Sequence, residues 1–350
     1  MITWKAEWFV HSFCFSKQFK RGFMQDFLPY DPNTKPVLMR RNGGLIAAYS
    51  PPSMAIRSGM LDVGLIGEGS HLAVLSFSPE GKWLHQCSTG DGYKGPQIAA
   101  ARNGGLYCGF VGTNTHLNLS QVAIAGGFPS EPIVKLSTSG LGTDGTPFMC
   151  ATPNDSFNML AMAWQGKRNP PFLEVAAFSP PSDGGDFLVG RRDFNFSVQS
   201  APSIVFVEDK MFVAFATDSM APGYHLCIVT LNASLQEVAS PFVDPTFADL
   251  KSASIVQFGD YLYVGFVDSG KHLNIGRVQP SWKVGPPSGF EIIGTSGYQT
   301  DVWPTLFTVP GSMLMGWQYN IDMSPLAIGK VTLSTTDTKI HNSEWPWAAV

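Results

Sequence analysis

The chain has 350 residues, of which 44% are hydrophobic and only 14% charged, with 36 glycines and 26 prolines. This composition favours many short strands joined by tight turns over a helical or disordered chain, and a closed all-β repeat can reach this length as one domain. The formal net charge is −4, without a cluster of lysine and arginine. Because phosphate neutralisation supplies most of the affinity for nucleic acids, we expect no nucleic-acid partner.

The cysteines and the apolar runs bear on the environment of the protein. The five cysteines are odd in number, widely spaced and free of CxxC pairs: Cys14, Cys87, Cys108, Cys150 and Cys227. Such a set is not typical of a disulfide framework or a zinc site, so we expect reduced thiols in the core. Apolar runs of signal-peptide or membrane-span length are also missing from the sequence. These features predict a cytoplasmic protein with no membrane span.

The first predicted element is the segment 1–33, which does not match the repeat that follows it. Phenylalanine recurs every fourth residue from Phe15 to Phe27, with basic residues in between, which is compatible with an amphipathic interfacial helix. We prefer the alternative that residues 4–15 add a strand to the last unit of a ring and join the two chain ends. An open ring would leave strand edges exposed.

A repeat occupies the rest of the chain, in which a small residue and an aromatic close a short apolar run. It occurs six times, at Ala48-Tyr49, Gly109-Phe110, Ala163-Trp164, Ala214-Phe215, Gly265-Phe266 and Gly316-Trp317. Each run follows a turn signal such as Asn103-Gly104-Gly105, which predicts the second strand of a hairpin. We interpret the aromatics as core between neighbouring sheets rather than as a ligand cage, since the small residue beside each one lets the sheets approach.

Strands before and after each aromatic run repeat as well. The predicted first strands usually open on proline, which loses no ladder hydrogen bond there; they begin at Pro36, Pro96, Pro147, Pro202, Ala253 and Pro304. The predicted third strands begin at His71, His116, Phe172, His225, His272 and Pro325. With a less regular fourth segment, each unit of about 50 residues is typical of a four-stranded propeller blade.

The sequence therefore predicts an all-β fold, a single β-propeller domain of about six four-stranded blades whose ring is closed by the N-terminal segment 1–33. We expect the blades at about 34–90, 91–142, 143–198, 199–250, 251–300 and 301–350. The four histidines that open third strands belong to different blades, so we expect structural, loop-bonding roles and no metal site.

A functional site is expected around the mouth of the central channel, on the face that carries the inter-blade connections and the loops after the second strands. Candidate substrate-binding residues on this face are Tyr93, Gln165, Arg168, Asp301, Trp303, Gln318 and Tyr319. These loops differ in length and residue type, which favours one asymmetric site over a repeated lectin site. Standard hydrolase motifs are missing, whereas 13 methionines and 12% aromatics suit a pocket for an apolar small molecule.

The strand pattern resembles that of propeller proteins of secondary metabolism. It combines first strands such as Pro96-Gln97-Ile98, second strands such as Gly265-Phe266 and third strands such as His272-Leu273-Asn274. In particular it is similar to the hetero-Diels-Alderases that join a tropolone-derived quinone methide to a humulene-type terpenoid. The resemblance implies a cofactor-independent pericyclase, in which a general acid helps to expel water and apolar walls align the alkene.

On this reading, His272 and Lys94 are candidates for catalytic proton transfer. Gln318, Tyr319 and Asp301 are candidates for orienting an oxygen, and Trp303 for a stacking wall. The sequence leaves two alternatives open, a sugar-binding, lectin-like propeller and a scaffold for protein partners.

Overall fold

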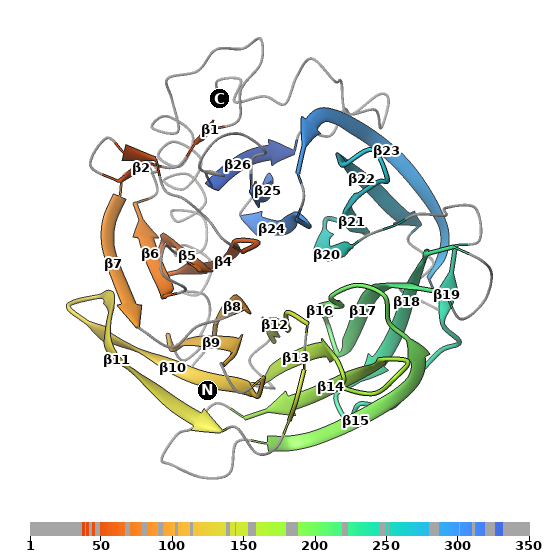
Figure 1. The fold of residues 1–350 in the computed structure, drawn as a ribbon, viewed down its shortest axis with the longest axis horizontal. Coiled ribbons are helices and arrows are strands. Elements are labelled where there is room, and N and C mark those ends of the chain that lie inside the picture. The colour runs from red at the N-terminus through yellow and green to blue at the C-terminus, as the bar shows by residue number, and fades with distance from the viewer. Residues whose placement is uncertain are drawn as a thin grey trace, which may run out of the picture.

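A computed structural model describes residues 37–38, 40–41, 44–45, 50–66, 71–78, 83–89, 94–101, 104–112, 115–137, 141–143, 145–152, 159–179, 188–218, 223–244, 250, 252–279, 287–300, 302–309, 312–318 and 326–331. Within these residues every regular element is a β-strand. Six antiparallel sheets of four strands are arranged around a ring (Figure 1). The predicted six-blade β-propeller is thereby confirmed. No helix in this described part of the chain has the length and apolar character that a membrane crossing requires.

Five blades are continuous in the chain, and each runs outward from the channel in strand order. Blade 1 contains β4 (Ser53–Arg57), β5 (Met60–Ile66), β6 (Leu72–Phe77) and β7 (Trp83–Thr89). Blade 2 contains β8 (Lys94–Ala100), β9 (Leu106–Val111), β10 (Leu117–Ala125) and β11 (Phe128–Ser137). Blade 3 contains β12 (Phe148–Ala151), β13 (Leu160–Gln165), β14 (Phe172–Phe178) and β15 (Leu188–Ser197). Blade 4 contains β16 (Ser203–Val207), β17 (Lys210–Thr217), β18 (His225–Asn232) and β19 (Phe242–Val243). Blade 5 contains β20 (Ala253–Phe258), β21 (Tyr261–Val267), β22 (His272–Gln279) and β23 (Ser288–Gln299).

Blade 6 joins the two ends of the described chain. It contains β24 (Thr305–Val309), β25 (Ser312–Gln318), β26 (Leu326–Val331) and, from the other end of the sequence, β1 (Val37–Leu38). Strand β1 pairs antiparallel with β26, so a strand that precedes blade 1 completes the last sheet and covers its edge. A separate two-stranded sheet follows, from β2 (Arg40–Arg41) and β3 (Gly44–Leu45). The segment 1–33, predicted to close the ring, lies outside the described residues.

Blade 1 is displaced along the chain from its predicted position. The predicted first strand at residues 36–38 was wrong, because Val37 and Leu38 are the fourth strand of blade 6. Ser53 pairs with Gly64 as Gln97 pairs with Gly109 in blade 2, so the slot after the small residue is filled by Leu65. The position after the small residue requires a bulky apolar side chain, which need not be aromatic. Because the sequence pattern is built on aromatic residues, it selects Tyr49 for blade 1 instead of Leu65.

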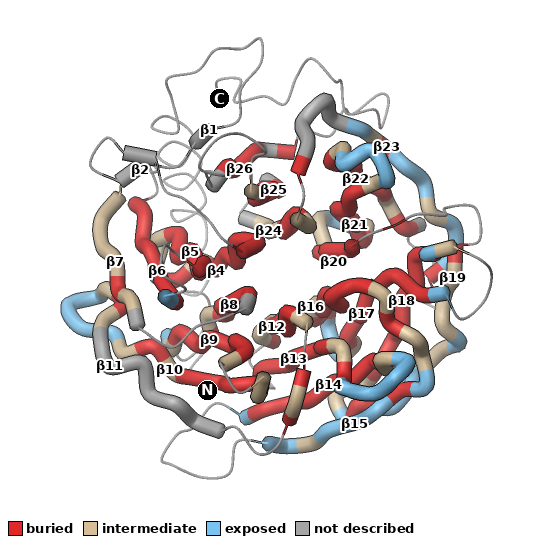
Figure 2. The backbone as a smooth tube through the Cα atoms, viewed as in Figure 1, coloured by how far each residue is buried: buried red, intermediate tan, exposed pale blue. Residues whose placement is uncertain are grey.

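The repeated aromatics form the core between neighbouring blades, as predicted. Trp164, Phe215, Phe266 and Trp317 are fully buried, and Figure 2 shows the inner strands of the ring as mostly buried. The small residue beside each aromatic is required by close packing. A β-carbon on Gly265, for example, would lie 2.9 Å from Leu306 Cγ of the next blade. The predicted free cysteines are also confirmed for Cys87, Cys108, Cys150 and Cys227, and Cys14 lies outside the described residues.

Serines on the first strands join neighbouring blades by hydrogen bonds. Ser53 Oγ accepts a hydrogen bond from Ile98 N at 2.9 Å, Ser203 Oγ from Ile255 N at 3.0 Å, and Ser254 Oγ from Leu306 N at 2.8 Å. The amide of each inner strand would otherwise face the ring axis without a sheet partner, since the first strand is the edge of its blade. The serine of the preceding blade supplies that partner.

We predict that Ser254→Ala lowers the free energy of unfolding by about 1–3 kcal/mol, because it leaves the Leu306 amide buried and unbonded. Ser252→Ala is the matched control, since Ser252 is equally buried and its hydroxyl has no hydrogen-bond partner. The control should leave stability unchanged or raise it. Urea unfolding of both variants measures the difference, and equal losses would contradict the assigned role of Ser254.

A buried ion pair ties blade 1 to blade 2. Arg57 Nε donates to Asp62 Oδ2 at 2.9 Å, and Arg57 Nη1 donates to the Gly127 carbonyl, also at 2.9 Å, in the turn between β10 and β11. Ser76 Oγ donates to the other oxygen of Asp62, which is fully buried. Burial raises the pKa of Asp62, and the hydrogen bonds from Ser76 and Arg57 oppose that rise.

Candidate functional site

The loops after the second strands and the inter-blade connections are bonded together on one face of the ring. In four blades a residue one or two positions before the third strand accepts a backbone hydrogen bond from the following connection. The bonds are Thr143 N to Thr115 O (3.1 Å), Val198 N to Pro171 O (2.9 Å), Leu250 N to Tyr224 O (3.0 Å) and Thr300 N to Lys271 O (3.0 Å). This arrangement agrees with the predicted shared face, which we call the mouth face.

Some of the predicted site residues are described on this face. Gln165 ends β13, Arg168 lies in the loop that follows, Gln318 ends β25, Trp303 precedes β24 and His272 begins β22. Of Lys94, the first residue of β8, only the backbone is described. The other three predicted residues, Tyr93, Asp301 and Tyr319, lie outside the described residues. The structure brings Gln165 and Arg168 together within one loop region, whereas His272 belongs to blade 5.

His272 is part of a bonded loop. Asp268 Oδ1 accepts a hydrogen bond from His272 N at 2.9 Å and lies 3.4 Å from His272 Nδ1. Asn274 Nδ2 donates to the His272 carbonyl at 2.9 Å, as Asn118 Nδ2 does to the His116 carbonyl in blade 2. Burial would raise the pKa of Asp268, but the hydrogen bonds from His272 and Asn274 outweigh it and the pKa is lowered.

In both blades the asparagine donates to the backbone carbonyl of the histidine and not to its imidazole ring, so the loop-bonding role of the histidine side chains stays a prediction. Across the described residues, no group of three or more histidine, cysteine or acidic side chains is placed to hold a metal ion. A proton-transfer role for His272 stays a prediction.

Trp303 contacts blades on the opposite side of the ring from its own blade. The residue precedes blade 6, yet its half-buried side chain packs against the apolar cluster between blades 3 and 4, which includes Val198 and Ala201. Because blade 5 separates blade 6 from blade 4, this contact crosses the ring near its axis. The predicted wall position of Trp303 is compatible with this placement.

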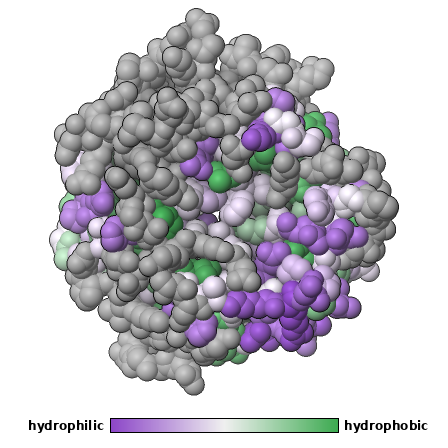
Figure 3. Space-filling view, viewed as in Figure 1, coloured by the Kyte–Doolittle hydropathy of each residue, from purple (hydrophilic) through white to green (hydrophobic). Residues whose placement is uncertain are grey.

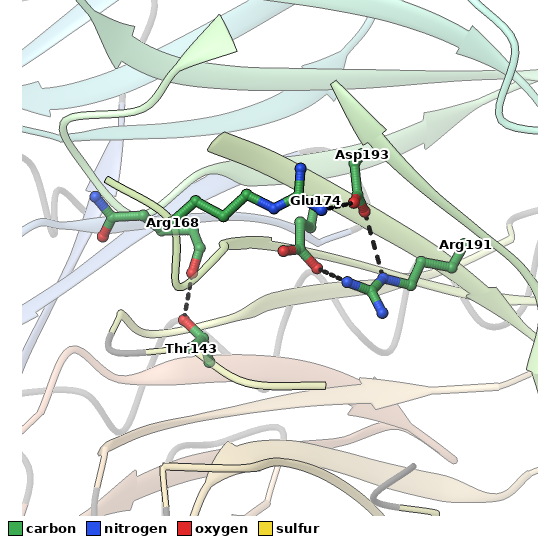
Figure 4. Close-up of polar contacts among 6 residues, drawn as sticks. Thr143, Arg168, Glu174, Arg191 and Asp193 are labelled. Carbon is green, nitrogen blue, oxygen red and sulfur yellow. Dashed lines mark hydrogen bonds and ion pairs between the residues drawn. The ribbon is translucent and has the colours of Figure 1, made fainter. Parts of the chain in front are cut away.

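A network of four charged side chains lies on blade 3, formed by Arg168, Glu174, Arg191 and Asp193, and we call it the blade 3 network (Figure 4). Arg191 bridges the two acids, with Nη2 2.7 Å from Glu174 Oε2 and Nε 3.4 Å from Asp193 Oδ1. Arg168 Nη2 donates to Asp193 Oδ2 at 3.1 Å. The Glu174 side chain is only 6% exposed, whereas that of Arg168 is 62% exposed. In Figure 3 hydrophilic side chains gather over β14 and β15, the strands that carry three of these residues.

Strand register places the two acids side by side, since Glu174 of β14 is the cross-strand partner of Asp193 of β15. The glutamate is specific to this blade. At its position in the third strand, the other five blades have uncharged residues: Ala73, Asn118, Cys227, Asn274 and Ala327. Blade 3 is therefore the one blade whose third strand places a carboxylate here.

The connection from blade 2 packs closely against Gln165 and the loop after β13, and Gly166 of that loop lies against Glu174 of the network. Thr143 Oγ1 donates to the Gln165 carbonyl at 2.7 Å, and Gln165 Nε2 donates to the Val198 carbonyl at 2.6 Å. A β-carbon on Gly145 would lie 3.0 Å from Gln165 Oε1, and one on Gly166 would overlap the Glu174 carboxylate. Glycine at these two positions lets the loop and the connection cover the buried end of Glu174.

The environments of the two acids differ. Burial raises the pKa of Glu174, the Arg191 charge opposes the rise, and the neighbouring Asp193 adds to it. Asp193 is more exposed and is bound by both arginines. The sequence interpretation found Arg168 and Gln165 but missed Glu174, Arg191 and Asp193. The available signal was a glutamate at a position that is uncharged in the other blades.

Neither a protein-family model nor a curated protein matches the chain, whereas many solved structures do. A mutant of AofleA from Arthrobotrys oligospora with three arginines changed to alanine is 12% identical, covers 91% of this chain and 94% of its own, and has a TM-score of 0.56. The SapL1 lectin in complex with α-methyl fucoside is 11% identical and covers 82% of this chain and 94% of its own, with a TM-score of 0.54.

An exo-β-1,3-galactanase from Phanerochaete chrysosporium with β-1,3-galactotriose is 11% identical, with a TM-score of 0.50. The match covers 88% of this chain and 66% of the galactanase, so this chain spans less than two thirds of that protein. At these identities the likeness shows the fold alone. The resemblance to propeller proteins is thereby supported, and its finer form, the resemblance to Diels-Alderases, has no support among these three structures.

Proposed function

We propose that this protein is a sugar-binding propeller whose ligand binds at the blade 3 network. The observation that carries the proposal is the network itself: two carboxylates and two guanidinium groups, held against one another and partly exposed on the mouth face. A sugar hydroxyl both donates and accepts hydrogen bonds, so neighbouring hydroxyls can donate to a carboxylate and accept from a guanidinium. Hydrogen bonds to charged groups are the strong ones.

The charge balance favours a neutral sugar. Arg168 and Arg191 offset Glu174 and Asp193, so the network has no formal charge to match with an ionic ligand. Its side chains are also fixed before a ligand arrives, because Arg191 binds both acids and Glu174 is covered by the loop. Less side-chain freedom is then lost on binding, which raises affinity.

Binding is favoured over hydrolysis by the same contacts. Glycoside hydrolysis by a carboxylate pair needs one acid free to donate a proton and the other free to act as base or nucleophile. Here both carboxylates are bound to Arg191, and Asp193 also to Arg168. The sugar ligands named for the SapL1 lectin and the galactanase support a sugar as the ligand class. The predicted cycloaddition has no comparable support.

The test is a glycan array followed by titration calorimetry with the best-binding sugar. We expect one site per chain and a loss of affinity of about 10- to 100-fold for Arg168→Ala and for Asp193→Asn, as for the loss of a hydrogen bond to a charged group. Lys271→Gln is the control, since Lys271 is exposed on the mouth face of blade 5. Unchanged affinity in both blade 3 variants would place the site elsewhere, and a wild-type protein that binds no sugar would overturn the proposal.

A further inference from the structure

The central channel contains a cavity of about 340 Å³ that the blade 3 network does not use. Four consecutive residues from the first strand of every blade line it: 53–56, 97–100, 148–151, 203–206, 254–257 and 305–308. Ligand pockets in proteins start at about this volume. An apolar cavity of about 150 Å³ holds benzene, so this one has room for a molecule of about twice that size.

The cavity has a mainly polar level, then an apolar wall two residues deep, and a last level that is polar only at Gln257 and Thr308. The first lining residue of each blade is paired with the small residue of the second strand, so these six residues share one level. They are Ser53, Gln97, Phe148, Ser203, Ser254 and Thr305. The next two residues of every strand are apolar or cysteine, for example Met54 and Ala55 in blade 1 and Met149 and Cys150 in blade 3.

Two side chains at the polar level have unused hydrogen-bonding groups. The three serines of this level bond the neighbouring blades, as described above. Gln97 Nε2 and Thr305 Oγ1 are buried and have no hydrogen-bond partner, and the two residues are only 2% and 7% exposed. A buried polar group without a partner costs about 1–3 kcal/mol. Such groups are rare in native proteins and point to a missing water or ligand.

The lining also restricts the charge of a ligand. Among the described residues that line the cavity, none is charged. An anion or cation would therefore lose its hydration without gaining a counter-charge, which is strongly unfavourable. Methionines such as Met54 and Met149 adapt to irregular apolar shapes. The wall thus suits an uncharged, mainly apolar molecule.

We propose that the channel is a second binding site, for a neutral small molecule with an apolar body and a single oxygen. The apolar body lies along the wall, and the oxygen lies at the level of Gln97 and Thr305, where it accepts hydrogen bonds from their unpartnered donors. This site is independent of sugar binding by the blade 3 network.

The experiment compares two probes of similar shape, acetophenone and ethylbenzene, which differ mainly by the ketone oxygen. Calorimetry on the full chain should give one site for each probe and tighter binding of acetophenone. Thr305→Val, alone and with Gln97→Leu, should weaken acetophenone binding by about 5- to 10-fold, as for the loss of a hydrogen bond. Ethylbenzene should bind these variants as it binds the wild type, because the wall is intact.

A third variant, Ala151→Phe, fills the channel and should abolish the binding of both probes, while urea unfolding confirms that it folds. Thr305→Val conserves the shape of the side chain and removes an unpartnered hydroxyl, so it should fold at least as stably as the wild type. Equal affinity for the two probes, equal losses for both in the polar variants, or no binding of either probe would each overturn the proposal.

Discussion

Replacing Asp62, which is fully buried, with alanine is expected to lower the free energy of unfolding by about 3–5 kcal/mol. The variant leaves the Arg57 guanidinium buried beside a cavity, with the Gly127 carbonyl as its remaining bonded partner in the described structure. An uncompensated buried charge is more costly than a lost hydrogen bond. Urea unfolding, followed by circular dichroism, measures the loss.

The double variant Arg57→Met with Asp62→Leu separates the cost of breaking the pair from its net contribution. Apolar side chains of similar volume often restore or exceed the original stability when they replace a whole buried ion pair. We expect that here, because Arg57 Nη2 is buried without a partner even in the intact pair.

Glu237→Gln is the matched control, since Glu237 pairs with Arg192 at 3.8 Å on the exposed side of β15. Such a surface pair contributes less than about 1 kcal/mol. If Asp62→Ala costs no more than this control, the buried pair is not what holds blade 1 to blade 2.

The architecture could be predicted because each blade repeats the same packing problem. Every second strand needs a small residue where the next sheet approaches and a bulky one beside it. Five of the six predicted pairs of a small residue and an aromatic lie at this place, in the second strands of blades 2 to 6. Blade 1 departs from the repeat because Leu65 is bulky without being aromatic. The closing strand β1 was predicted as a strand but assigned to the wrong blade, since its partner β26 lies at the other end of the sequence.

The candidate site was less predictable for a related reason. Gln165 and Arg168 follow a predicted strand directly, so topology alone placed them on the mouth face. Glu174, Arg191 and Asp193 meet through the register between β14 and β15, which includes irregularities at both ends of the ladder. A one-residue shift of register would turn each of these side chains to the other face of the sheet. Pattern analysis of the strands does not determine that register.

The residues at the polar level of the channel could be read from the sequence, but their hydrogen bonding could not. Serine, glutamine or threonine follows the opening residue of most first strands, which was visible in the aligned repeats. Its meaning depends on geometry: the same position bonds the next blade at Ser203 and Ser254, and has no bonded partner at Gln97 and Thr305. Only the positions of the neighbouring strands distinguish these two cases.

Replacing Trp317 with alanine is expected to cost about 3–5 kcal/mol, the range for a large aromatic removed from a core. Trp317 is fully buried in the cluster between blades 5 and 6, together with residues such as Tyr263 and Met315. Its strand, β25, lies inside the blade that β1 completes with only two residues. The variant therefore opens a cavity in the blade that joins the two chain ends.

Trp317→Leu tests whether the position after Gly316 needs only a large apolar side chain or specifically an aromatic ring. Leucine fills the same position in blade 1 at Leu65, which is 2% exposed. The leucine variant should lose less stability than the alanine variant, because the cost of a core truncation grows with the volume of the cavity that it leaves. Equal losses for leucine and alanine would show that the ring itself is required, and that blade 1 meets the same packing problem by rearranging its neighbours. A loss below about 1 kcal/mol for alanine would mean that blades 5 and 6 close over the gap. The propeller would then be held together at this position by the strand pairing between β26 and β1 rather than by core packing.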